Sequence, residues 1–173
     1  MLNGDNLRRF TSISLVIILI GSACLSIHTG PQKITIADWG QVLTSYHGSF
    51  LVVYVWTGWC RSCVEALPHL KEIQRHYQSE GLYFVSLSLD DENDIEAINQ
   101  TLRETRIDGE YYLLRGDFSE LIDKIDIRSV PSILIYNRDG RRLVTLSDDR
   151  LENKFFLENL ESSLGAIARD GEI

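Results

Sequence analysis

The feature that most constrains the fold is a continuous apolar run at residues 50–56, Phe-Leu-Val-Val-Tyr-Val-Trp. Such a run, rich in β-branched and aromatic residues, is typical of a central strand that is buried on both faces. Helical spacing follows almost at once, because apolar residues then recur every three or four positions: Val64, Leu67, Leu70, Ile73 and Tyr77. A buried strand that leads directly into an amphipathic helix predicts an α/β fold with a central sheet flanked by helices.

The rest of the chain alternates between strand-like and helix-like segments. We expect further strands over residues 82–89, 111–114, 132–136 and 142–146, and helices from the acidic stretch 90–94 to about residue 106, over 118–125 and over 151–168. Asp139-Gly140 lies between the last two strands and predicts a tight hairpin. Residues 34–46 carry apolar side chains at helical spacing.

The acidic stretch at residues 90–94 has two interpretations. Acidic side chains stabilise a helix N-terminus, which predicts a solvated helix start. A calcium-binding loop is the alternative, but such a loop requires glycine at its sixth position, where this chain has Ile95. The sequence therefore favours the helix start.

Charge excludes one class of function. The 173 residues include 17 Lys and Arg against 25 Asp and Glu, and the net charge is −8. The sequence contains no cluster of basic residues, so its charge argues against a nucleic-acid binder.

The N-terminal segment differs from the rest of the chain. Arg8 and Arg9 precede an uncharged run whose centre is strongly apolar, which indicates an export segment and places the following domain outside the cytoplasm. The sequence leaves three outcomes open: a retained membrane anchor, cleavage after Ala23, or lipidation of Cys24. We expect residues 1–32 to form a signal peptide or anchor and residues 33–173 to form one domain in a compartment that permits disulfides.

The chemistry of the chain lies at Trp59-Cys60-Arg61-Ser62-Cys63. The strand-to-helix junction places Cys60 at a helix N-terminus, where free backbone N–H groups stabilise a thiolate and Arg61 adds positive charge. Cys60 is therefore expected to be the more acidic and more exposed thiol, the nucleophile. Cys63, one turn into the helix, is expected to be the buried resolving thiol.

Two other uses of the cysteine pair are possible. Half of a zinc site would need two further ligands, and His69 and His76 follow at spacings unlike the usual finger. A structural disulfide would close a loop too short to stabilise the fold much through chain entropy.

Two segments carry a family resemblance. Residues 50–70, FLVVYVWTGWCRSCVEALPHL, resemble the active-site strand and helix of thioredoxins, including the Trp before the first Cys. Residues 125–143, IDIRSVPSILIYNRDGRRL, resemble the thioredoxin segment that contains a cis-proline. The additional strand-helix element over residues 82–114, together with the export segment, resembles the TlpA-like and ResA-like branch of periplasmic or membrane-anchored thiol-disulfide oxidoreductases.

The resemblance implies a thioredoxin-like fold with a mixed sheet and a cis bond between Val130 and Pro131. It implies that Pro131 packs against the disulfide and keeps metal from the thiols, and that the backbone of Val130 pairs with an extended substrate. Trp59 would cover the active-site face, while Arg61 and Ser62 would tune the potential. No cofactor is implied beyond the redox-active disulfide itself. The implied partners are protein thiols or disulfides, such as apocytochrome in cytochrome c maturation, and a membrane electron donor.

The sequence departs from that family at two positions. Tyr54 stands where thioredoxins bury an acid, and Ala66 stands where the ResA-like branch has Glu. Proton transfer from Cys63 therefore lacks its usual carboxylate unless the neighbouring Glu65 or water replaces it. These departures support an alternative function, a thioredoxin-like binding module with weak or no redox turnover. A thiol peroxidase is a third possibility, which the cysteine spacing disfavours.

Overall fold

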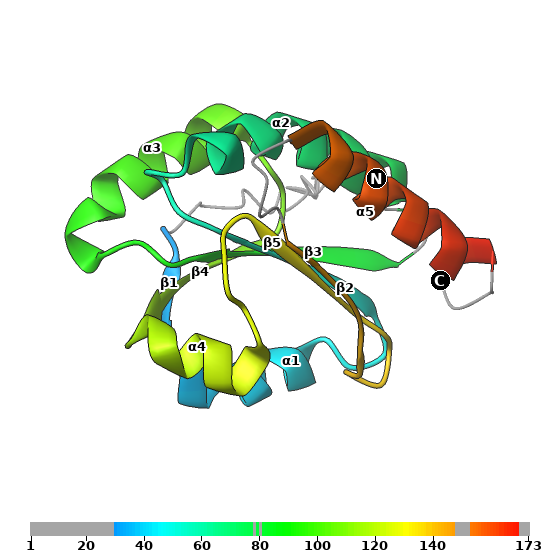
Figure 1. The fold of residues 1–173 in the computed structure, drawn as a ribbon, viewed down its shortest axis with the longest axis horizontal. Coiled ribbons are helices and arrows are strands. Elements are labelled where there is room, and N and C mark those ends of the chain that lie inside the picture. The colour runs from blue at the N-terminus through cyan, green and yellow to red at the C-terminus, as the bar shows by residue number, and fades with distance from the viewer. Residues whose placement is uncertain (1–29, 78, 80, 148–152, 170–173) are drawn as a thin grey trace, which may run out of the picture.

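The structure is a computed structural model, and it describes residues 30–77, 79, 81–147 and 153–169. Six strands form one mixed sheet in the order β1-β4-β3-β2-β5-β6. Figure 1 shows this sheet between two helical layers, with α2, α3 and α5 on one face and α1 and α4 on the other. The strands are β1 (Gln32–Thr35), β2 (Phe50–Trp56), β3 (Leu82–Ser88), β4 (Glu110–Arg115), β5 (Ser132–Tyr136) and β6 (Arg142–Ser147). The helices are α1 (Trp39–Ser45), α2 (Arg61–Tyr77), α3 (Ile95–Thr105), α4 (Phe118–Ile125) and α5 (Asn153–Arg169), with 3-10 turns η1 (Ile36–Asp38) and η3 (Glu92–Asp94).

The apolar run at residues 50–56 forms the central strand, as predicted. Strand β2 pairs in parallel with β3 and antiparallel with β5, so that Val53 lies opposite Val85 on one side and Leu134 on the other. All seven residues of β2 are buried. The prediction of a mixed sheet flanked by helices is confirmed.

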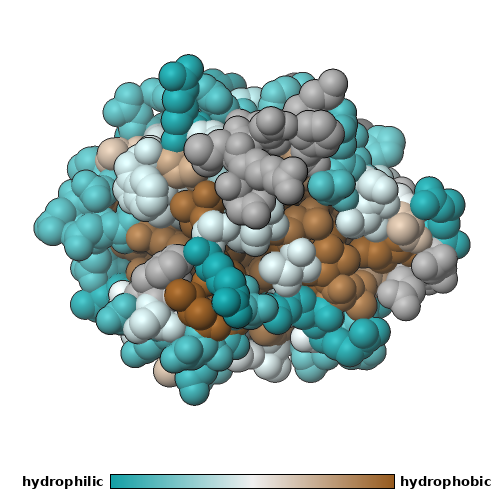
Figure 2. Space-filling model, in the orientation of Figure 1, coloured by the Kyte–Doolittle hydropathy of each residue, from teal (hydrophilic) through white to brown (hydrophobic). Residues whose placement is uncertain are grey.

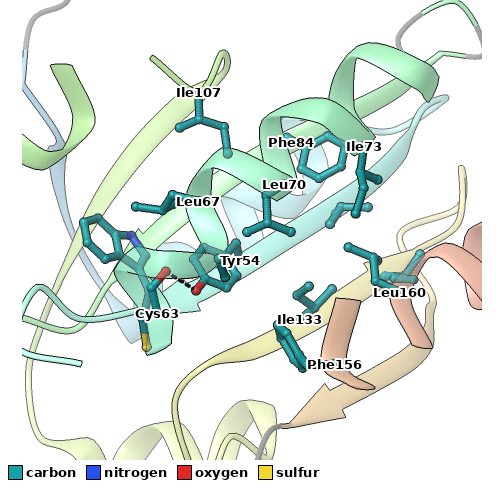
Figure 3. Packing of buried hydrophobic residues seen from close by; sticks show 14 of the residues in the cluster. Tyr54, Cys63, Leu67, Leu70, Ile73, Phe84, Ile107, Ile133, Phe156 and Leu160 are labelled. Carbon is teal, nitrogen blue, oxygen red and sulfur yellow. Dashed lines mark hydrogen bonds between the residues drawn. The ribbon is translucent and has the colours of Figure 1, made fainter. Parts of the chain in front are cut away.

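Alternate residues of β2 contribute to two separate cores. Val52, Tyr54 and Trp56 pack in the larger core under α2 and α5, whereas Leu51, Val53 and Val55 pack against α1 and α4. Figure 3 shows the larger core, in which Leu67 and Leu70 of α2 and Leu160 of α5 lie over the sheet. Figure 2, in the orientation of Figure 1, shows hydrophobic residues across the middle of the molecule, between hydrophilic residues above and below.

One strand is absent from the sequence-based prediction. Residues 34–46 include apolar side chains at helical spacing, but the structure has the strand β1 up to Thr35, then the turn η1 and then α1. In β1 only Ile34 is buried, so the strand is too short to produce a recognisable alternation of apolar and polar residues. Its parallel pairing with β4 adds it to the sheet.

The other expected elements are found close to their predicted bounds. Helix α4 occupies residues 118–125 as expected, and β5 and β6 form the predicted hairpin, with Gly140 at φ 75° in the turn. The predicted start of the last helix, at residues 151 and 152, and the export segment before residue 30 lie outside the described residues. Within the described ranges, no helix has the length and apolar character needed to cross a lipid bilayer.

Candidate active site

The two cysteines form a disulfide at the start of α2, with their Cα atoms 5.2 Å apart. Cys60 ends the short connection between β2 and α2, and its carbonyl accepts a hydrogen bond from the backbone N–H of Val64 at 3.1 Å. Its sulfur accepts the backbone N–H of Cys63 at 3.2 Å. Cys60 thus occupies the N-cap position of the helix, with a sulfur atom where a capping oxygen is usually found.

This position favours the thiolate form of Cys60 in the reduced protein. The N–H of Cys63 and the hydroxyl of Ser62, whose Oγ lies 3.4 Å from the Cys60 sulfur, can both donate to a negatively charged sulfur. The positive end of the helix dipole acts in the same direction. Cys60 has 7% of its surface exposed and Cys63 has 0%, so the predicted order of accessibility is present in the structure.

A shallow pocket of about 340 Å³ opens over the disulfide and is lined by Trp59, Cys60, Arg61, Ser62, Glu65 and Val130. Trp59 is 74% exposed, the most exposed large hydrophobic side chain in the described part of the chain. Val130 comes to this pocket from the loop before β5, and the expected cis bond between Val130 and Pro131 is present. Pro131 itself is buried beneath the surface. Residues from two distant segments therefore meet at the disulfide.

Arg61 and Glu65 form an ion pair on the exposed side of α2. The Nε of Arg61 lies 2.7 Å from Oε1 of Glu65, and the two side chains are 90% and 54% exposed. This hydrogen bond raises the pKa of the Arg61 guanidinium above its ordinary value. The positive charge expected to act on Cys60 is thus partly offset by Glu65, and Glu65 is directed to the surface of α2.

Tyr54 stands on β2 at the position where thioredoxins bury an acid, and its side chain bonds to α2. Its phenol donates a hydrogen bond of 2.8 Å to the backbone carbonyl of Cys63, shown as a dashed line in Figure 3. Ala66, at the other position noted in the sequence, is buried in the core. Strand β2 and the first turn of α2 are therefore joined by a neutral group beneath the disulfide.

Asp90 is a buried acid, so the prediction of a solvated helix start is wrong for this residue. Only 6% of Asp90 is exposed. Both of its carboxylate oxygens accept the backbone N–H of Gly58, at 2.9 and 2.8 Å, and Oδ2 also accepts the hydroxyl of Ser88 at 2.7 Å. The neighbouring Asp91 does cap the turn η3, because it accepts the N–H of Asn93 at 2.9 Å.

His69 and His76 do not line the pocket at the sulfur of Cys60. His69 and His76 are exposed on α2, where they line a separate groove against α5. In the described ranges no group of three or more His, Cys, Asp or Glu side chains is arranged to hold a metal ion.

A Cys-x-x-Cys disulfide at the N-terminus of the helix that follows the central strand of this sheet defines a thiol-disulfide oxidoreductase of the thioredoxin-like type. The chain belongs to the thioredoxin-like family, whose model, described as thioredoxin-like, matches residues 48–155. No curated protein matches the chain in sequence.

Solved structures share the fold at low sequence identity. The thioredoxin domain of a thiol-disulfide oxidoreductase from Bacteroides vulgatus is 22% identical, with a TM-score of 0.54 over 66% of this chain and 84% of that one. A secreted disulfide oxidoreductase of Mycobacterium tuberculosis, homologous to DsbE of E. coli, is 15% identical, with a TM-score of 0.54 over 69% and 85% of the two chains. StoA from Bacillus subtilis is 19% identical, with a TM-score of 0.51 over 67% and 82%.

Proposed function

We propose that the chain is an extracytoplasmic oxidoreductase that reduces disulfides of partner proteins, with Cys60 as nucleophile and Cys63 as resolving thiol. The observation that carries this proposal is the position of the Cys60 sulfur. It caps helix α2, where it accepts an N–H at 3.2 Å, and it borders an open pocket, whereas Cys63 is fully buried.

The proposed reaction transfers two electrons from the dithiol to the substrate. The Cys60 thiolate attacks one sulfur of a substrate disulfide, a mixed disulfide forms, and the other substrate sulfur leaves as a thiolate that takes up a proton. Cys63 then gives its proton to Glu65 or to water and attacks the Cys60 sulfur. The second substrate thiol is released, and the Cys60–Cys63 disulfide seen in the structure is formed. A dithiol donor, proposed to lie in the membrane, must reduce it again.

We assign the substrate-binding surface to Trp59, Val130 and Pro131. The exposed indole of Trp59 offers apolar area at the pocket, Val130 also lines the pocket, and the buried Pro131 follows Val130 in the chain. An extended substrate segment can pair with the backbone at Val130 by strand addition. Arg61 and Ser62 modulate the sulfur chemistry, Arg61 through its ion pair with Glu65 and Ser62 through its hydroxyl beside Cys60.

The proposed location follows from the N-terminal sequence. Residues 1–32 would export the domain of residues 33–173 and then remain as an anchor, be cleaved after Ala23, or be lipidated at Cys24. One structural relative fits this proposal, because the disulfide oxidoreductase of Mycobacterium tuberculosis is a secreted protein. Apocytochrome, as in cytochrome c maturation, remains one proposed substrate.

The decisive experiment measures the reduction potential of the Cys60–Cys63 couple in glutathione buffers and, in parallel, insulin disulfide reduction. We expect a potential of about −250 to −300 mV, on the thioredoxin side of the scale, together with turnover that the C60S variant abolishes. The C63S variant should accumulate a mixed disulfide. A potential near about −120 mV would instead indicate a thiol oxidant and contradict the reducing direction.

A second function is favoured by one observation. The positions that carry a proton-accepting carboxylate in related proteins hold Tyr54, bonded to the Cys63 carbonyl, and the buried Ala66. Without that carboxylate the chain could act as a binding module that holds partners at the pocket and exchanges disulfides slowly. Insulin reduction that is negligible in the native chain and unchanged by C60S would support this alternative.

A further inference from the structure

Asp90 is a carboxylate held inside the protein by neutral groups alone. It follows strand β3 and accepts hydrogen bonds from the Gly58 N–H and the Ser88 hydroxyl, and its own N–H donates to the Ser88 oxygen at 3.1 Å. Within the described residues no ion pair includes Asp90. Burying a charge without a counter-charge costs free energy, and these hydrogen bonds offset part of that cost.

The group that Asp90 binds belongs to the segment that carries the nucleophile. Only residues 57–59 separate the end of β2 from Cys60. The main chain of this segment is fixed at one side of Gly58 by the bond from the Leu89 N–H to the Trp56 carbonyl, at 2.9 Å. The turn that follows is closed by the Cys60 N–H, which donates to the Thr57 carbonyl at the longer distance of 3.3 Å. Asp90 binds the N–H of Gly58, which belongs to the same peptide group as that carbonyl.

We propose that Asp90 is a positioning residue for the disulfide exchange, acting through Gly58. By holding this amide, the carboxylate fixes the turn that places Cys60 at the N-cap of α2 and Trp59 at the rim of the pocket. Without this bond the turn is free to move, and the Cys60 sulfur spends less time where the Cys63 N–H stabilises its thiolate. This role rests on the proposed function of Cys60 as nucleophile.

The bond and the charge of Asp90 can be separated by two variants. Asp90→Asn and Asp90→Ala both remove the negative charge, but the amide oxygen of Asn can still accept the Gly58 N–H. The ratio between these two variants therefore reports the loss of the hydrogen bonds of this side chain at the same net charge. Ser88→Ala is the matched control, because it removes the two bonds between the Ser88 hydroxyl and Asp90 and leaves those to the Gly58 N–H.

The experiment uses the full chain in its reduced form. It measures the rate at which the Cys60 thiol reacts with a small aromatic disulfide, 5,5′-dithiobis(2-nitrobenzoate). Equilibration with glutathione buffers gives the potential of the same variants. We expect Asp90→Ala to react about fivefold more slowly than Asp90→Asn, as the loss of one neutral hydrogen bond predicts. Ser88→Ala should stay within about twofold of the native chain.

Equal rates and equal potentials for folded Asp90→Ala and Asp90→Asn would overturn the inference, and so would a loss in Ser88→Ala as large as that in Asp90→Ala. Should circular dichroism show that Asp90→Ala is unfolded, Asp90→Ser takes its place, because its hydroxyl is too short to reach Gly58. The small disulfide needs no partner protein. If the native chain reacts with this small disulfide but does not reduce insulin, the proposed function is refuted. The role of Asp90 is then still decided by the comparison of Asp90→Ala with Asp90→Asn.

Discussion

Replacing Tyr54 by Phe tests whether the phenol beneath the disulfide stabilises the fold. The substitution removes one hydroxyl and keeps the aromatic ring in the core, where 1% of Tyr54 is exposed. It removes the hydrogen bond to the Cys63 carbonyl, at 2.8 Å between two buried residues. A neutral intramolecular hydrogen bond contributes about 1 kcal/mol net, so the free energy of unfolding should fall by about that amount.

Urea unfolding of the oxidised full chain measures this change. With a slope of about 1–3 kcal/mol per molar urea, a loss of about 1 kcal/mol lowers the midpoint by roughly 0.3–1 M, with the slope itself unchanged. Tyr83→Phe is the matched control, because Tyr83 is 53% exposed and its hydroxyl should contribute less than about 0.5 kcal/mol.

Two results would refute the reasoning. If Tyr54→Phe leaves the midpoint at the native value, the hydroxyl contributes nothing net and β2 does not hold α2 through this bond. If the loss exceeds about 3 kcal/mol, the ring itself must have moved, since a single neutral hydrogen bond cannot account for so much.

The remaining predictions concern the packing of α5 and the stability at high pH. Leu160→Ala should lower the free energy of unfolding by about 2–5 kcal/mol, because Leu160 is fully buried in the larger core. Leu157→Ala is the control, and it should lower that free energy less because Leu157 is only partly buried. Equal losses in urea unfolding would contradict the docking of α5 on the sheet. Burial, with a smaller effect of Asp108, raises the pKa of Tyr111 from 10.0 to about 12. The folded protein thus holds this proton more tightly than the unfolded chain, so stability that is present below pH 10 is lost as the pH rises toward about 12. Urea unfolding at a series of pH values over this range should show a shallower decline of the unfolding free energy for Tyr111→Phe than for the native chain.

Local patterns in the sequence were enough to predict the centre of the fold and the redox pair. About thirty residues contain all the features needed, and each feature is a short-range pattern: the apolar run at residues 50–56, the helical spacing after it and the two cysteines. The cis bond before Pro131 could be expected only through the family resemblance, because an isolated proline has a small chance of a cis bond.

What the sequence did not show depends on contacts between distant segments. Asp90 and Gly58 are 32 positions apart, and the residue types at positions 90–94 do not distinguish the buried carboxylate from the exposed ones. The bond from Tyr54 to Cys63 likewise exists because a strand and a helix pack together. The one available signal was the place of Asp90 directly after a buried strand, where the chain has not yet reached the surface.

The order of the strands also bears on how the protein behaves at high concentration. Among the described strands, β1 and β6 each pair along one side only, so each presents backbone groups with which another chain could form an intermolecular sheet. β1 offers just four residues, including the charged Lys33, and the pairing of β6 with β5 is irregular beside Tyr136. Short, charged and irregular edges are poor templates for aggregation. At high concentration these two edges should therefore resist pairing with the edge strands of other copies of the chain.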